Sequence, residues 1–181
     1  MTRARFGGGG ARPAPRSLNE LMGQALTMER EAVARYTELA DMMETHNNLD
    51  VAALFRKMAG YEQLHVEQIL ADMGWAADVV VPRQSGVWGT PESPEVVPIE
   101  DMHYLMHPWH ALQAALSAEQ RAEAFFAEMA GTAADEAVRQ AAEEMRREEA
   151  EHVALVLEWL AKVPQPDSDW SVDPDPPRHM D

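Results

Sequence analysis

Two stretches of the sequence share the pattern that decides the fold. Residues 58–65 read MAGYEQLH and residues 145–152 read MRREEAEH, so a shift of 87 positions superimposes a Met, a Glu and a His. In an α-helix, a Glu and a His three positions apart project from the same face. Each stretch, when helical, can therefore direct one oxygen and one nitrogen into the same cavity.

Proline and glycine divide the chain around these stretches into four helical segments. Residues 17–46, 50–73, 108–131 and 133–163 contain no proline apart from one at a helix start, and they are rich in good helix formers. The first and third junctions are short, which favours antiparallel hairpins, whereas residues 74–107 hold four prolines and must cross over between the hairpins. The sequence predicts an all-α four-helix bundle, made of two antiparallel helical hairpins joined by a long crossover.

The faces that would line the core carry a second pattern. Steps of three and four positions give an apolar seam along each helix, and polar residues interrupt each seam only near its middle. A shift of 90 positions lays residues 24–40 on residues 114–130 with seven identities, so the two hairpins are pseudo-symmetric. The interruptions of the seams are Glu29, Glu62, His65, Glu119, Glu149 and His152.

Four carboxylates at one depth of a core need a counter-charge, because burying an ionised carboxylate is costly even after relaxation. No lysine or arginine occupies a seam position. Two divalent cations would bring four positive charges and could take the two imidazoles as neutral ligands, so the six residues predict a dinuclear metal site. The alternative is a helical scaffold whose seam glutamates are protonated or hydrated, and it predicts that chelation leaves the melting temperature unchanged.

The composition limits the chemistry further. The 181 residues include 15 Lys and Arg, 31 Asp and Glu and no Cys, for a net charge of −16. Without thiols the chain cannot form a disulfide, a zinc-thiolate site, a cysteine-ligated iron–sulfur cluster or a cysteine nucleophile. The acidic charge disfavours nucleic acid and anionic membranes as partners. The chain has no membrane-spanning apolar run and no secretory signal, so a cytoplasmic location is expected.

Both ends of the chain differ in composition from the helical part. Residues 1–16 hold four arginines, no acidic residue and a run of four glycines, so we expect a flexible basic tail. Residues 164–181 hold five prolines and are expected to form an irregular C-terminal tail. Residues 17–163 remain as one bundle domain.

Two further groups of polar side chains have open roles. His103, His107 and His110 flank a predicted helix start, where they could form a second metal site or His107 could serve the helix end. Tyr36 lies two turns after Glu29 on the same seam. It is either a catalytic residue that faces the metals or a tyrosine of the core.

These motifs resemble those of the ferritin-like superfamily, and specifically those of rubrerythrins. The resemblance covers residues 17–163 and implies a ferritin-like bundle in which the six polar seam residues are the metal ligands. It also implies that Glu62 and Glu149 bridge the two metals. The resembling motifs are residues 29–32 (EREA) with Tyr36, residues 54–65 (LFRKMAGYEQLH) and residues 148–152 (EEAEH).

The chain departs from rubrerythrins at two points. They carry a Cys-x-x-Cys rubredoxin module that supplies electrons, and this chain has no cysteine. They also add a Glu three residues after the ligand on the third helix, where this sequence has Ala122. The electrons for any turnover must therefore come from an external donor.

The ligand set and the resemblance together predict a function. Oxygen and nitrogen donors without thiolate suit two Fe ions, with Mn as the alternative. We expect a non-haem di-iron protein that reacts with peroxide or O2, as a rubrerythrin-like oxidoreductase or a ferroxidase. An iron-storage protein and a di-iron oxygenase acting on a small organic substrate remain as alternatives. The irregular crossover and ends favour a homodimer over the tightly tiled shell of a storage cage.

Overall fold

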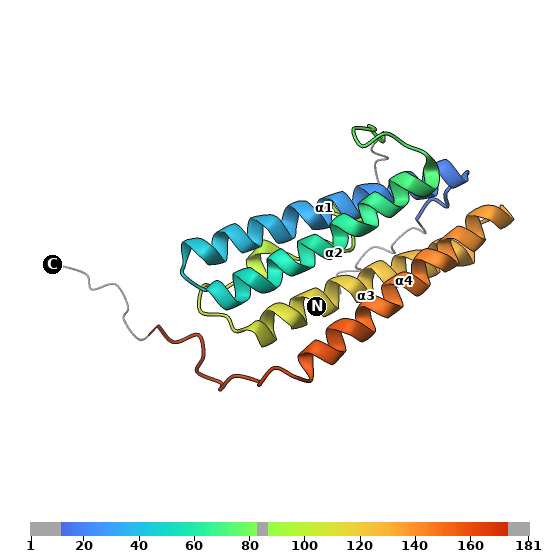
Figure 1. The fold of residues 1–181 in the computed structure, drawn as a ribbon. Helices are drawn as coiled ribbons and strands as arrows, with labels where there is room; N and C mark the ends of the chain where they lie inside the picture. The colour runs from blue at the N-terminus through green and yellow to red at the C-terminus, as the bar shows by residue number, and fades with distance from the viewer. Residues whose placement is uncertain (1–11, 83–86, 174–181) are drawn as a thin grey trace, which may run out of the picture.

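The described part of the chain forms four long α-helices and one short 3-10 helix. A computed structural model describes residues 12–82 and 87–173. Within them, α1 pairs with α2 and α3 pairs with α4 as antiparallel hairpins (Figure 1). These ranges contain no strand, which confirms the predicted all-α, ferritin-like four-helix bundle. The elements are α1 (Leu18–Thr45), α2 (Leu49–Met73), η1 (Ile99–Asp101), α3 (Pro108–Thr132) and α4 (Glu136–Leu160).

Local side-chain and backbone chemistry sets the helix ends. Ser17 accepts a hydrogen bond from the backbone N–H of Glu20 (3.2 Å), and Asp135 accepts one from the N–H of Val138 (3.1 Å). The Asp135 cap starts α4 three residues later than the sequence predicts. α2 ends at Gly74, whose φ of 64° lies in the left-handed region that glycine adopts at little cost.

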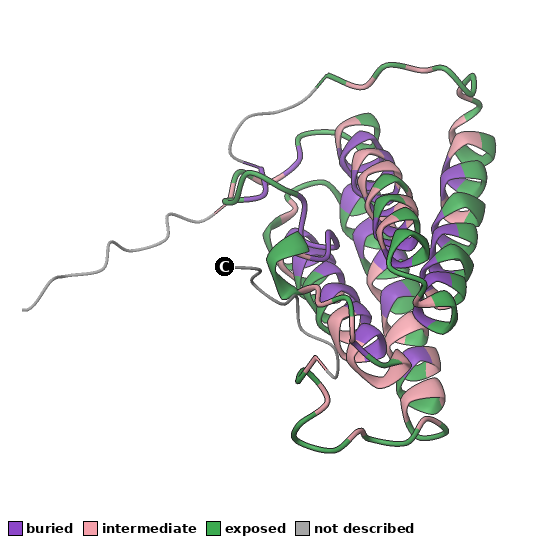
Figure 2. Ribbon diagram, turned by 90° about the vertical axis from the view of Figure 1, so that its left-hand side faces the viewer, coloured by how far each residue is buried: buried purple, intermediate pink, exposed green. Residues whose placement is uncertain are grey.

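The hydrophobic core consists of two clusters stacked along the bundle. One cluster takes the first part of α1 and α4 and the last part of α2 and α3, and it includes Leu26 and Phe126. The other takes the opposite part of each helix and includes Phe55 and Leu112. Figure 2 shows the buried residues on the inward faces of the helices. In every helix the boundary between the clusters falls at the polar seam residues, so the apolar core is split where the sequence predicts the metal site.

The crossover between α2 and α3 packs against the bundle in two parts. The first part places Val79 and Val81 against a core cluster, and the Arg30 guanidinium donates to the carbonyl oxygen of Val79 (2.8 Å). In the second part Trp88 packs edge-on against Phe125, with ring centroids 5.1 Å apart. The crossover is therefore anchored to the helices on both sides of the undescribed residues.

Segments next to the two chain ends also contact the bundle. Arg12 donates to a carboxylate oxygen of Glu128 (2.9 Å). At the other end, the Trp170 ring lies 3.9 Å from that of His110. The rest of the predicted basic tail and of the predicted C-terminal tail, residues 1–11 and 174–181, lies outside the described residues.

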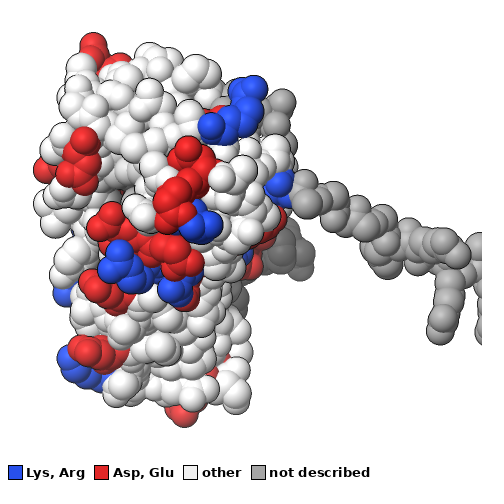
Figure 3. Space-filling view, turned by 90° about the vertical axis from the view of Figure 1, so that its right-hand side faces the viewer, with Lys and Arg blue, Asp and Glu red and all other residues white. Residues whose placement is uncertain are grey.

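Charged side chains of both signs are mixed on the surface. On the face in Figure 3, acidic and basic side chains lie next to one another. Arg146, for example, lies 2.9 Å from Glu143 and 3.8 Å from Glu123. None of the helices in the described part of the chain is long and apolar enough to cross a membrane.

Candidate metal centre

The six predicted metal ligands meet at the middle of the bundle. The carboxyl groups of all four glutamates are buried, whereas the side chains of the two histidines keep 23% and 21% of their surface exposed. Two groups of ligand atoms, within 4.8 Å of one another in each group, contain His152, and one of them also contains His65. These two groups are Glu62, His65 and His152, and Glu119, Glu149 and His152.

The two halves of the centre repeat one another. The Nδ1 atom of His65 lies 3.3 Å from an oxygen of Glu62 on its own helix and 3.6 Å from the seam glutamate of α1. The Nδ1 atom of His152 lies 3.3 Å from Glu149 on its own helix and 3.5 Å from the seam glutamate of α3. The two imidazole rings stack with their centroids 4.3 Å apart and their planes 8° apart. Each hairpin thus contributes one imidazole nitrogen and two carboxylates.

Buried polar atoms without a hydrogen-bond partner gather at this centre. They include one oxygen each of Glu29 and Glu149 and both oxygens of Glu119. A buried carboxylate oxygen without a partner is costly, and a bound cation would remove that cost. The donor set therefore fits divalent metal ions.

The pKa values at the centre reflect both burial and the neighbouring charges. Burial raises the pKa of Glu29 to about 8 and that of Glu119 to about 7. Burial lowers the pKa of both histidines, but the adjacent carboxylates outweigh it and raise the pKa of His65 to about 10 and that of His152 to about 11. Without metal, the raised pKa values keep protons on these groups to higher pH than in an unfolded chain, and metal binding competes with those protons.

A fifth buried carboxylate reaches the centre from the crossover. Glu95 is 1% exposed, and neither of its oxygens has a hydrogen-bond partner. It forms one group of ligand atoms within 4.8 Å with Glu29 and Glu149, and a second with Glu62 and Glu119. Burial raises the pKa of Glu95 well above its ordinary value, and the surrounding carboxylates raise it further.

Helical periodicity could not reveal Glu95, because the residue lies in an irregular segment. The available signal is its local sequence, SPEVVP at residues 93–98, where one glutamate precedes two valines between prolines. An apolar neighbourhood of this kind is unusual for an exposed loop.

Comparison with known proteins identifies the family. The family model described as Rubrerythrin matches residues 20–97. A solved structure of an uncharacterized conserved protein from Magnetospirillum magnetotacticum is 38% identical in sequence, covers 83% of this chain and 98% of that chain, and gives a TM-score of 0.64. The chain belongs to the rubrerythrin family. A comparison with curated proteins finds no match.

The match to the rubrerythrin model covers the first half of the centre. It contains the ligand candidates on α1 and α2, and Glu95 lies near its end. Glu119, Glu149 and His152 lie beyond the matched residues. Their inclusion in the centre rests on the geometry. The distance from the histidine Nδ1 to the glutamate of its own helix is 3.3 Å in both hairpins, and the distance to the seam glutamate of the other helix is 3.6 Å in the matched hairpin and 3.5 Å in the second hairpin.

Tyr36 lies beside the carboxylates without belonging to a ligand group. The residue is 1% exposed, its hydroxyl has no hydrogen-bond partner, and its ring stacks on Phe55 with centroids 6.0 Å apart. Burial raises the pKa of Tyr36 well above its ordinary value, and the charges of Glu119 and Glu62 raise it further. A neutral phenol is thus held near the centre, while Phe126 at the pseudo-symmetric position has no hydroxyl.

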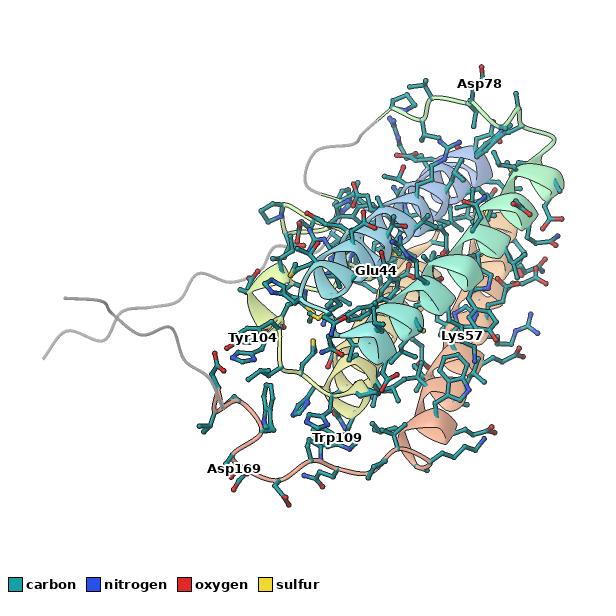
Figure 4. All side chains as sticks on the ribbon, turned by 60° about the vertical axis from the view of Figure 1, so that its left-hand side comes forward. Glu44, Lys57, Asp78, Tyr104, Trp109 and Asp169 are labelled. Atoms are coloured by element: carbon teal, nitrogen blue, oxygen red, sulfur yellow. The ribbon has the colours of Figure 1, made fainter. Side chains whose placement is uncertain are left out.

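In this rubrerythrin-family chain, the second histidine cluster, His103, His107 and His110, makes aromatic contacts and contacts at the start of a helix. Among the described residues, no group of ligand atoms close enough for a metal includes His103, His107 or His110. The N–H of His107 donates to Nδ1 of His110 (3.1 Å) at the start of α3, and Trp170 packs against the rings of His103 and His110. Figure 4 shows this end of the bundle around Trp109. These three residues therefore belong to no ligand group among the described residues, and His107 lies at the start of α3 as its N-cap residue, as the other alternative predicts.

A cavity between α2 and α4 leads to the two histidines. Its volume is 450 Å³, and its lining includes His65, His152, Met145, Glu144 and Glu148. The acidic side chains around such an opening attract cations. This cavity is a candidate entry route for metal.

Proposed function

We propose that this rubrerythrin-family protein is a di-iron carboxylate protein that reacts with peroxide or O2, as an oxidoreductase or a ferroxidase. The observation that supports the proposal is the paired set of stacked imidazoles and buried carboxylates, whose unpartnered oxygens lie at one level of the bundle. Two divalent ions would offset the charge of the four seam glutamates. Iron suits this set of oxygen and nitrogen donors, and manganese is the alternative.

The residues of the centre would have different roles around the metals. Glu62 and Glu149 would each hold metal together with the histidine of its own helix, and the two residues come from different hairpins. When bound, iron supplies one-electron redox chemistry toward O2 or peroxide. Carboxylates can change between one-oxygen and two-oxygen binding as the charge of the site changes. Tyr36 holds a proton at its hydroxyl beside these carboxylates and is the candidate proton donor. An external donor supplies the electrons, because the chain has no cysteine.

Anaerobic iron loading tests the proposed site. We expect two iron ions per chain by elemental analysis of the desalted protein, and a loss of most of this iron in Glu62→Ala and His152→Ala. Glu158→Ala is the matched control, because it removes an exposed glutamate of α4 outside the ligand groups. The proposal would be contradicted if the wild type retained no iron after loading and desalting, or if both ligand variants retained as much iron as the wild type.

Re-oxidation kinetics then identify the reactant. The di-ferrous protein is mixed in a stopped-flow instrument with peroxide and, separately, with O2. We expect the iron to be oxidised, and the oxidant that gives the higher rate identifies the reaction. Peroxide as the faster oxidant supports a peroxidase, and O2 as the faster oxidant supports a ferroxidase. Failure of both to oxidise the loaded protein would contradict either activity.

Particle size separates this function from storage. The chain has a mass of 20.2 kDa, and we expect light scattering to give a homodimer of twice that mass. A closed cage with many iron ions per chain would instead support a storage protein.

A further inference from the structure

We propose that Glu95 is a seventh protein ligand of this centre, and that metal binding through Glu95 fixes the crossover to the bundle. The inference rests on the proposed function, since it requires that the centre binds metal. It adds to that function a ligand from outside the four helices and a structural response of the segment that carries it.

The environment of Glu95 is that of a ligand without its metal. The residue is 1% exposed, and both carboxylate oxygens lack a hydrogen-bond partner. A glutamate buried for structural reasons would be paired with a donor, because the desolvation of an unpartnered carboxylate otherwise destabilises the fold. Four further carboxylates lie close to it, and they offer no donor when ionised.

The distances around Glu95 suit a shared ion. Its ligand atom lies within 4.8 Å of those of Glu29 and Glu149, and within 4.8 Å of those of Glu62 and Glu119. Donor atoms bound to one ion at about 2.1 Å lie no more than about 4.2 Å apart. Adjustment of the side-chain torsions would bring the oxygens of either group into the coordination sphere of one ion.

The backbone around Glu95 is held in place by both hairpins. Arg121 of α3 donates to the carbonyl oxygens of Pro94 (2.7 Å) and Val96 (3.1 Å), which bracket Glu95 in the chain. Arg35 of α1 donates to the carbonyl oxygen of Val97. The two arginines thus direct an irregular segment toward the centre, as second contacts around a metal site orient its ligands.

Three proteins test the role of Glu95. Glu95→Gln removes the charge and keeps the shape of the side chain. Glu100→Gln is the matched control, because Glu100 lies on the same crossover, is exposed and belongs to no ligand group. Each full-length protein is titrated anaerobically with Fe²⁺ by equilibrium dialysis, and amide hydrogen exchange of residues 93–97 is measured with and without the metal.

We expect Fe²⁺ to slow exchange at residues 93–97 in the wild type and in Glu100→Gln. In Glu95→Gln the metal should still bind, with the dissociation constant of at least one ion raised by about tenfold or more, a loss of about 1.4 kcal/mol or more in binding free energy. Its crossover amides should no longer respond to the metal. Wild-type affinity together with a wild-type exchange response in Glu95→Gln would overturn the inference. Absence of Fe²⁺ binding in all three proteins would instead overturn the proposed di-iron function, on which the inference depends.

Thermal unfolding shows whether Glu95→Gln has a folding defect. Metal-free Glu95→Gln should melt at a higher temperature than the metal-free wild type, because a buried carboxylate is removed from among four others. With Fe²⁺ bound, the order should reverse. A variant that melts lower than the wild type in both states would show a purely structural role for Glu95 and would also overturn the inference.

Discussion

Metal-free protein should lose stability as the pH is raised from about 7 to about 9. Burial raises the pKa of Glu29 to about 8, and carboxylate neighbours outweigh burial to raise the pKa of His65 to about 10 and that of His152 to about 11. The ordinary values, to which the groups return in the unfolded chain, are 4.5 for the glutamate and 6.5 for the histidines. The folded protein therefore binds more protons than the unfolded chain in this range, so the free energy of unfolding falls as the pH rises.

The size of the effect follows from the number of extra protons. Each one changes the free energy of unfolding by roughly 1.4 kcal/mol per pH unit. The two imidazoles stack 4.3 Å apart and their positive charges repel, so we count one net proton over two pH units. We expect a fall of roughly 3 kcal/mol in the free energy of unfolding, or about 6–12 °C in Tm for a chain of this length. The chain has no cysteine and contains only two lysines, Lys57 and Lys162, so the groups that titrate in the same range lie mainly at the centre.

Urea unfolding followed by circular dichroism, in chelator and at several pH values, measures this slope. Metal-loaded protein should behave in the opposite way, because metal displaces the protons and its stabilisation grows with pH. His65→Gln should flatten the slope of the metal-free protein, and His46→Gln, which alters an exposed histidine outside the centre, should preserve it. A metal-free wild type whose stability is flat or rises over this range would refute the reasoning.

Three further substitutions test other parts of the molecule. Tyr36→Phe should leave metal-free stability within about 1 kcal/mol, because the hydroxyl has no partner, and should slow re-oxidation of the iron-loaded protein; unchanged stopped-flow rates would exclude Tyr36 as proton donor. Gly23→Ala should lower the free energy of unfolding in urea by up to about 2 kcal/mol, because its Cβ would lie 2.7 Å from Cγ1 of Val81 and this clash outweighs a gain of about 1 kcal/mol in helix propensity; an unchanged midpoint would show that the crossover moves to accommodate the Cβ. Arg121→Met should speed hydrogen exchange around Pro94 while α4 exchanges as before, and equal exchange would contradict the anchoring.

The helices and six ligand candidates could be predicted because both follow the helical period. Spacings of three and four residues place Glu62 and His65 on one inward face, and the repeat at 87 positions places Glu149 and His152 in the same way. The split of the core into two clusters at this level has the same origin, since the polar residues interrupt every seam at one depth.

Glu95 and the histidine cluster could not be predicted, because their positions depend on contacts between distant parts of the chain. Glu95 is directed inward by Arg35 and Arg121, which bind carbonyl oxygens of an irregular segment. The ring of His110 is covered by Trp170, from the segment that follows α4. Neither contact leaves a periodic signal in the sequence, and the roles of these residues follow only from the folded chain.

The centre combines a symmetric ligand set with asymmetric surroundings. The two hairpins supply matching donors, yet Tyr36 places a hydroxyl on one side where Phe126 has none, and Glu95 comes from a crossover that occurs once in the chain. The affinity and redox properties of a bound metal depend on the charges and donors around its ligands. Two ions in this centre would therefore differ from one another, although the helices offer each of them the same kinds of ligand. In the proposed di-iron centre, the pseudo-symmetric hairpins supply matching ligands and the segment that joins them makes the two metal positions unequal.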